Sequence, residues 1–179
     1  MSPMTSRPLT LELILLGLLR QGSLHGYSIH QQFSARQDLG MIWRIKQSQL
    51  YALLAKLEGR GLVTSALQSQ EPRPPRKMYS LTAQGVEVFQ DWLSRPVPNS
   101  RQVRQEFMAK MFFARQESEA CLHALVQAQR VSCQQWLAAF QARAEVLQVE
   151  RPYEWLIYQY RIGQVQAILE WLDIVENYS

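Results

Sequence analysis

Side chains able to bond nucleic-acid bases and phosphates are concentrated between residues 44 and 77. Gln47 and Gln49 carry amides, which can bond an adenine edge through two hydrogen bonds, and Ser48 places a hydroxyl between them. Cations that can neutralise phosphates surround these residues: Arg44, Lys46, Lys56, Arg73, Arg76 and Lys77. These residue types indicate a site for a polyanion, with base contacts expected at residues 47–49.

The distribution of charge supports a polyanionic partner. The net charge is +4, and residues 1–100 hold 11 Lys and Arg against 6 Asp and Glu, whereas residues 101–179 hold 8 against 9. Cations gathered around one helix and one loop are typical of a protein that binds nucleic acid.

The element expected to position the amides is a helix over residues 47–59. Its apolar side chains fall at helical spacing and predict one buried stripe: Leu50, Leu53, Leu54 and Leu57. The adjoining face is small apart from one tyrosine, and it consists of Ser48, Tyr51, Ala52 and Ala55. Small residues allow close approach to the DNA major groove, so this face favours a recognition helix.

The segments around this helix predict a winged helix-turn-helix. Two helices, at residues 9–20 and 27–36, and a looser segment at 37–46 come before it. Strands are expected at 62–68 and 77–81, and the three prolines in residues 69–76 predict a stiff basic loop between them. Thr82 is expected to cap a fourth helix. The fold class is therefore mainly α with a small β-hairpin.

A Pro-rich break at residues 96–100 divides the chain into two expected domains, 1–95 and 96–179. Helices are predicted at about 101–114, 117–149 and 153–178, and the last two are apolar over wide arcs. A second copy of the chain is the expected partner, which predicts a C-terminal helical dimerisation domain. The predicted contacts are Leu122, Val126, Leu137, Phe140, Ile162, Val165, Leu169 and Leu172.

Several other classes of protein are disfavoured. No apolar run approaches the ~20 residues of a membrane span, and no signal peptide is recognised, so a cytoplasmic location without membrane contact is expected. Cys121 and Cys133 predict two core residues, with a redox-sensing pair as the alternative. No paired carboxylates in a plausible cleft, nucleophile elbow, P-loop or metal-ligand set is present, so neither catalysis nor a cofactor or metal is expected.

Four motifs in order resemble the PadR family of bacterial transcriptional regulators: HGYSI (25–29), QLYALLAKLEGRGLV (49–63), RKMYSLTAQG (76–85) and EFMAKMFF (106–113). The likeness spans about residues 9–115, and the remainder is similar to long-tailed members with a C-terminal helical dimerisation domain. The resemblance implies that Tyr27 and Tyr51 lie on the DNA-facing side and that Arg76 and Lys77 form a basic wing. Ala52 departs from the proline that the family often has there, and the segment 37–46 has no clear counterpart.

The resulting hypothesis is a sequence-specific DNA-binding transcriptional regulator that acts as a homodimeric repressor on a promoter operator. Release by a small molecule, often aromatic in such proteins, is implied by the resemblance. The candidate effector contacts are Trp136, Trp155 and Tyr158, whose alternative role is to fill a helical core. The alternative function is a winged-helix protein-interaction module that does not bind DNA.

Overall fold

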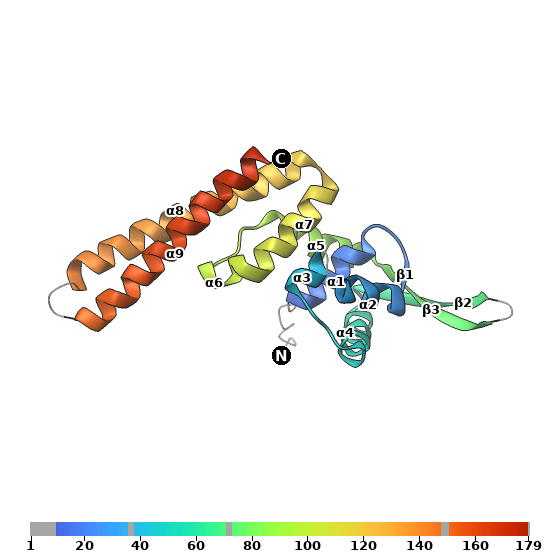
Figure 1. The fold of residues 1–179 in the computed structure, drawn as a ribbon. Coiled ribbons are helices and arrows are strands. Elements are labelled where there is room, and N and C mark those ends of the chain that lie inside the picture. Colours follow the sequence, from blue (N-terminus) through green and yellow to red (C-terminus); the bar gives the residue numbers. More distant parts are fainter. Residues whose placement is uncertain (1–9, 36–37, 71–72, 148–150, 179) are drawn as a thin grey trace, which may run out of the picture. The chain divides into compact units, whose positions relative to one another are not determined.

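The chain forms two compact units, Met1–Leu93 and Ser94–Ser179, in a computed structural model (Figure 1). The structure describes residues 10–35, 38–70, 73–147 and 151–178, and it leaves out the side chains of residues 69, 70 and 73–75. Mainly helical elements with a small sheet match the fold class expected from the sequence.

The first unit contains the expected order of helices and hairpin. Its elements are α1 (Thr10–Leu19), β1 (Leu24–His25), α2 (Gly26–Ser34), α3 (Leu39–Ile42), α4 (Gln47–Gly59), β2 (Val63–Gln70), β3 (Arg73–Leu81) and α5 (Ala83–Ser94). The segment predicted to be loose, 37–46, contains α3 and then an extended stretch that leads into α4. Residue 37 lies outside the described residues.

Helix α4 forms where its apolar stripe predicts it. Leu50, Leu54 and Leu57 are fully buried in the core of the unit. The helix ends because Gly61 has a φ of +72°, in the left-handed region that favours glycine. The N–H of Leu62 donates to the carbonyl of Leu57 at 3.0 Å and that of Gly61 to Glu58 at 2.9 Å, the pattern of a Schellman motif. This stop turns the chain directly into β2.

The sheet differs from the prediction in two ways. It has three strands in the order β1-β3-β2, and β1 was not predicted. The prediction that residues 69–76 form a loop is wrong, because β2 continues to Gln70 and β3 starts at Arg73. Gln68 pairs with Arg76 and Gln70 pairs with Arg73. Between these pairs β3 has one residue more than β2, so the ladder is irregular there.

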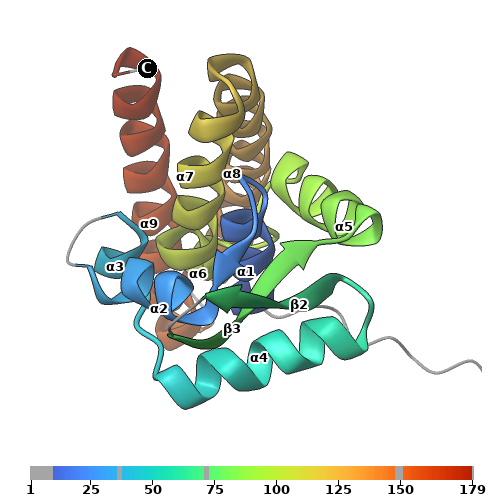
Figure 2. The ribbon, with the colours of Figure 1, turned by 90° about the vertical axis from the view of Figure 1, so that its right-hand side faces the viewer.

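The prolines explain why the strand was missed. Pro74 and Pro75 lie within that irregularity, where the pairing of β2 and β3 is interrupted. Proline has no N–H to give to the ladder, but it is tolerated at bulges and at unpaired edges. On its other side, β3 pairs with β1 at Met78 and Tyr79, away from the prolines. Figure 2 shows the hairpin of β2 and β3 beside α4.

The fourth helix of the first unit begins as expected. The hydroxyl of Thr82 accepts a hydrogen bond from the N–H of Gly85 at 3.0 Å, which caps α5. The same hydroxyl donates to the carbonyl of Gly61 at 2.7 Å. Thr82 therefore joins the start of α5 to the stop of α4.

All the secondary-structure elements described in the second unit are helices, and they follow an irregular stretch at residues 95–99. Its elements are α6 (Ser100–Gln102), a π-helical turn η1 (Val103–Phe107), α7 (Met108–Glu117), α8 (Glu119–Leu147) and α9 (Pro152–Asn177). The long helices α8 and α9 run side by side (Figure 1). Arg130 of α8 joins them through ion pairs of 2.6 Å to both Asp173 and Glu176 of α9.

Half of the predicted dimerisation residues lie in the core of this unit. Leu122, Val126, Val165 and Leu172 are buried within the single chain. Within the single chain these four therefore pack inside the unit, and their contact with a second copy stays a prediction. The other four, Leu137, Phe140, Ile162 and Leu169, are partly exposed. Helix α8 packs against α7 as well as α9, and the sequence reasoning had not counted α7 as a neighbour.

Candidate nucleic-acid interface

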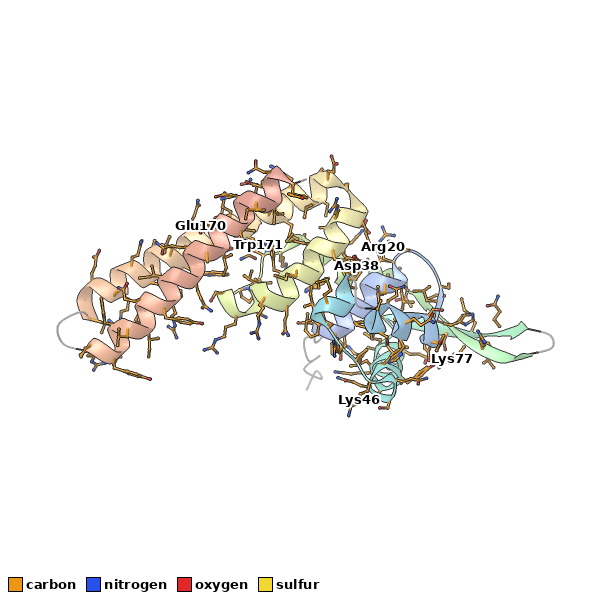
Figure 3. All side chains as sticks on the ribbon, in the orientation of Figure 1. Arg20, Asp38, Lys46, Lys77, Glu170 and Trp171 are labelled. Carbon is orange, nitrogen blue, oxygen red and sulfur yellow. The ribbon has the colours of Figure 1, made fainter. Side chains whose placement is uncertain are left out.

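The N-terminal part of α4 presents the predicted base-contacting residues to solvent. Gln47, Ser48 and Gln49 are exposed, since the buried stripe of α4 lies on the opposite side. Arg44 and Lys46 are exposed just before them, and Figure 3 labels Lys46 at this end of the helix. The N-cap residue, Lys46, makes no capping hydrogen bond with its side chain. Unbonded helix N–H groups and two cations together favour an anion such as a phosphate.

Tyr51 is placed by a glycine that the sequence reasoning did not single out. A Cβ built on Gly26 would lie 2.6 Å from Cε1 of Tyr51, so the phenol ring rests against the backbone at the start of α2. Tyr51 keeps 39% of its surface exposed, and Tyr27, next to the glycine, keeps 58%. The structure therefore brings the two tyrosines to neighbouring elements, and the Gly-Tyr pair in HGYSI was the available signal for Gly26.

The hairpin of β2 and β3, here called the wing, has two cations among its described side chains. One of them is paired with a described carboxylate and the other is not. Arg76 is exposed and has no ion pair with any residue that the structure describes. Lys77 donates from Nζ to Oε2 of Glu58 at 2.9 Å and lies 5.2 Å from the centre of the Tyr79 ring. The Arg73 side chain lies outside the described ones.

The pKa values of the wing pair follow from this geometry. Hydrogen bonds from Ser65 and then from Lys77 lower the pKa of Glu58. The hydrogen bond to Glu58 raises the pKa of Lys77. Both groups are therefore ionised at neutral pH, and Lys77 already has an anionic partner before any DNA is present.

The buried carboxylate of Glu12 pairs with Lys56, which the sequence analysis had predicted as a phosphate contact on α4. Glu12 of α1 is fully buried and lies 2.5 Å from Nζ of Lys56 and 3.0 Å from a guanidinium nitrogen of Arg60. Lys56 stays 42% exposed. The sequence reasoning missed this role of Glu12, although a single carboxylate in the otherwise apolar residues 11–19 was a visible signal.

The predicted effector residues are only partly brought together. Tyr158 meets Phe140 at an angle, with ring centres 5.9 Å apart, and the Arg161 guanidinium lies over both rings. Trp136 and Trp155 are half-buried. None of the ring contacts found among the described residues joins either tryptophan to this group.

Other kinds of site find no support in the part of the chain that the structure describes. It contains no group of three or more His, Cys, Asp or Glu arranged to hold a metal. None of its helices has the length and apolar character needed to cross a membrane. Burial raises the pKa of both cysteine thiols, and Cys133 is fully buried, as a core residue would be.

Comparison with known proteins finds sequence matches for both units. Residues 15–91 match the transcriptional regulator PadR-like family, and residues 103–178 match the virulence activator alpha C-terminal family. The negative transcriptional regulator PadR of Bacillus subtilis is 41% identical over 103 residues, which are 58% of this chain and 56% of that protein. A probable transcriptional regulator of Mycobacterium tuberculosis is 27% identical over 88 residues, 49% and 45% of the two chains. The chain thus spans about half the length of the curated relatives it matches.

Two solved structures of Bacillus subtilis PadR are also similar. The complex with operator DNA is 30% identical, covers 93% of this chain and 97% of that one, and has a TM-score of 0.49. The complex with p-coumaric acid is 29% identical, covers 93% and 96%, and has a TM-score of 0.43. Both TM-scores lie below 0.5, so the structural likeness adds no weight to the sequence matches.

Proposed function

This chain belongs to the PadR-like family of transcriptional regulators, whose model its residues 15–91 match, and we propose that it binds duplex DNA sequence-specifically as a homodimeric repressor. The observation that carries the proposal is the exposed N-terminal face of α4, with two amides, a hydroxyl and a tyrosine beside exposed cations. Promoter DNA is the proposed partner, and the cytoplasm is the proposed place of action.

The first unit has candidate residues both for contacts to bases and for contacts to phosphates. Gln47 and Gln49 would read base edges in the major groove, with about 1–3 kcal/mol of discrimination for each good bidentate pair. Arg44, Lys46 and Arg76 would contact phosphates and fix the register of the protein on the duplex. Lys56 and Lys77 are weaker candidates, because each already pairs with a carboxylate.

The second copy of a dimer would cover an exposed row of apolar side chains on α9. This exposed α9 row is spaced at helical intervals, and its members are 36% to 86% exposed: Tyr153, Ile157, Tyr160, Ile174 and Tyr178. The row has one stretch at residues 153–160 and another at 174–178, which ends at the C-cap residue Tyr178, and it lies on a different side from the buried Val165 and Leu172. An apolar surface of this extent is typical of an interface, and a second identical helix matches its length and spacing.

Repression and effector release are the finer parts of the proposal. The Bacillus subtilis relative is a negative regulator, which supports repression here. A small aromatic effector would contact Trp136, Trp155 and Tyr158. Arg161 lies over the Tyr158 ring and could bind an acidic group on such a ligand.

The test measures binding to fluorescent duplexes that tile the region upstream of the gene, against a random duplex of equal length. We expect one tile to bind more tightly than the random duplex, with affinity falling steeply as salt rises. Replacing both Arg76 and Lys77 by alanine should weaken binding to every duplex and flatten the salt dependence. A wild-type protein that binds no duplex in low salt would overturn the proposal and favour the protein-interaction module.

A further inference from the structure

The side chain of Glu58 ties the end of the recognition helix to both strands of the wing. Glu58 is the last residue but one of α4. One carboxylate oxygen accepts a hydrogen bond from the Ser65 hydroxyl on β2, and the other accepts from Lys77 on β3 at 2.9 Å. A single carboxylate thus contacts three successive elements of the DNA-binding unit.

The strand register explains how one side chain reaches both strands. Ser65 pairs with Tyr79 and Leu67 pairs with Lys77, so Ser65, Lys77 and Tyr79 lie on one face of the hairpin. Tyr79 is buried, and its ring centre lies 5.2 Å from Nζ of Lys77. Arg76 is the neighbour of Lys77 in the strand and therefore points to the other face of the hairpin.

This arrangement divides the two wing cations by role. A cation that is already paired with a carboxylate gains little from a phosphate, because it must first give up its partner. Arg76 has no such partner among the described residues, whereas Lys77 has Glu58. A phosphate contact by Arg76 is therefore favoured over one by Lys77.

We propose that Glu58 is a positioning residue for sequence specificity, which holds the wing against α4 and keeps Lys77 from binding phosphates indiscriminately. The proposal rests on the proposed function, since it assumes that α4 and the wing contact the same duplex. Its consequence is that loss of the Glu58 charge should strengthen binding to arbitrary DNA while reducing the preference for the operator.

The experiment compares wild type with Glu58→Gln on a random duplex and on the tightest upstream tile, at several salt concentrations. Glutamine can still accept from Ser65 but no longer neutralises Lys77. We expect the salt slope on random DNA to steepen by up to about 0.9, the value for one added phosphate contact, with roughly five- to tenfold tighter binding near 0.1 M salt. The ratio of tile affinity to random affinity should fall.

Two further variants separate the role of Glu58 from a general charge effect. Glu87→Gln removes one negative charge from the exposed surface of α5 and should leave the salt slope at its wild-type value. Glu58→Gln combined with Lys77→Gln should return the slope to that value, because the freed cation is gone. Circular dichroism on each variant verifies that the fold is kept.

The outcomes distinguish this inference from the proposed function. If wild type binds DNA and Glu58→Gln has the same slope and operator preference as wild type, the role of Glu58 is wrong while DNA binding stands. An equal effect of Glu87→Gln would also overturn it. If wild type binds no duplex at all, the proposed function itself is refuted.

Discussion

Individual carboxylates decide which cations of this protein are available to a polyanion. Glu12 forms ion pairs with Lys56 and Arg60, and Glu58 forms one with Lys77. Counting cations along the sequence treats all of them alike. The pairings instead leave Arg44, Lys46 and Arg76 as exposed cations of the first unit with no ion pair to a described residue.

The buried carboxylate of Glu12 gives a prediction about stability. Glu12→Gln should lower the free energy of unfolding by about 1–3 kcal/mol, because it leaves Lys56 and Arg60 without their counterion. This loss of free energy is small for a broken buried ion pair, because Lys56 is 42% exposed and keeps part of its hydration. Urea unfolding followed by circular dichroism measures it. The exposed Glu87→Gln serves as control and should change the free energy by less than about 0.5 kcal/mol.

The lowered pKa of Glu58 predicts a pH dependence in the acid range. Because the pKa in the folded protein lies below the ordinary value of 4.5, the ionised carboxylate stabilises the fold above that pH. This stabilisation is lost as the pH falls through the folded pKa. The difference in melting temperature between wild type and Glu58→Gln should therefore be constant between about pH 5 and 7 and shrink below 4.5. A difference that does not change with pH in this range would contradict the assignment.

At the level of elements, the strands of the wing extend further toward its tip than the sequence predicted. The prolines that suggested a loop lie at an irregularity of the ladder, where their missing N–H groups cost little. The stop at Gly61 and the Thr82 hydroxyl together fix where β2 leaves α4 and where α5 begins. Helix α4 thus passes into β2, and β3 into α5, through short, hydrogen-bonded turns.

Two glycine-to-alanine substitutions test how closely other atoms pack against α5 and α9. A Cβ on Gly85 would lie 2.1 Å from the carbonyl oxygen of Leu62, so Gly85→Ala should destabilise the first unit by about 1–3 kcal/mol. Gly163, inside α9, has no atom within 4 Å of such a Cβ. Gly163→Ala should therefore stabilise the protein by about 0.5–1 kcal/mol through helix propensity. Thermal unfolding of both variants should show shifts of opposite sign, and a destabilised Gly163→Ala would show that this face of α9 is covered.

At the level of the whole molecule, the C-terminal unit has one apolar row inside and another outside. Val165 and Leu172 are fully buried, whereas Tyr153, Tyr160 and Ile174 of the exposed α9 row are more than half exposed. A dimer that uses the exposed row would present two recognition helices to one duplex, and their half-sites would be spaced by about one helical turn or a multiple of it.

Two substitutions on α9 separate dimerisation from folding. Ile174→Asp places a charge in the exposed α9 row, so we expect a folded protein that sediments as a monomer at micromolar concentration. Leu172→Ala removes a buried side chain and should destabilise the unit by about 2–5 kcal/mol. Sedimentation equilibrium and circular dichroism measure the two effects. An Ile174→Asp protein that sediments like wild type would rule out this row as the interface.

The amino-acid sequence by itself determined the features that depend on local spacing. The leucines of α4 predicted both the bounds of the helix and its buried side, and Thr82 predicted the start of the next helix. The four ordered motifs indicated the family, which the match of residues 15–91 confirmed. Such features could be predicted because neighbours within a few turns or residues specify them.

Tertiary structure alone decided the features that depend on residues far apart in the chain. Lys56 meets Glu12 from 44 positions earlier, and Leu172 packs inward because α9 lies against α8. The pairing of Lys77 with Glu58 likewise needs the hairpin register, which in turn depends on how the ladder passes the prolines. A sequence pattern gives the type and direction of a side chain, but its partner is set only when the elements pack together.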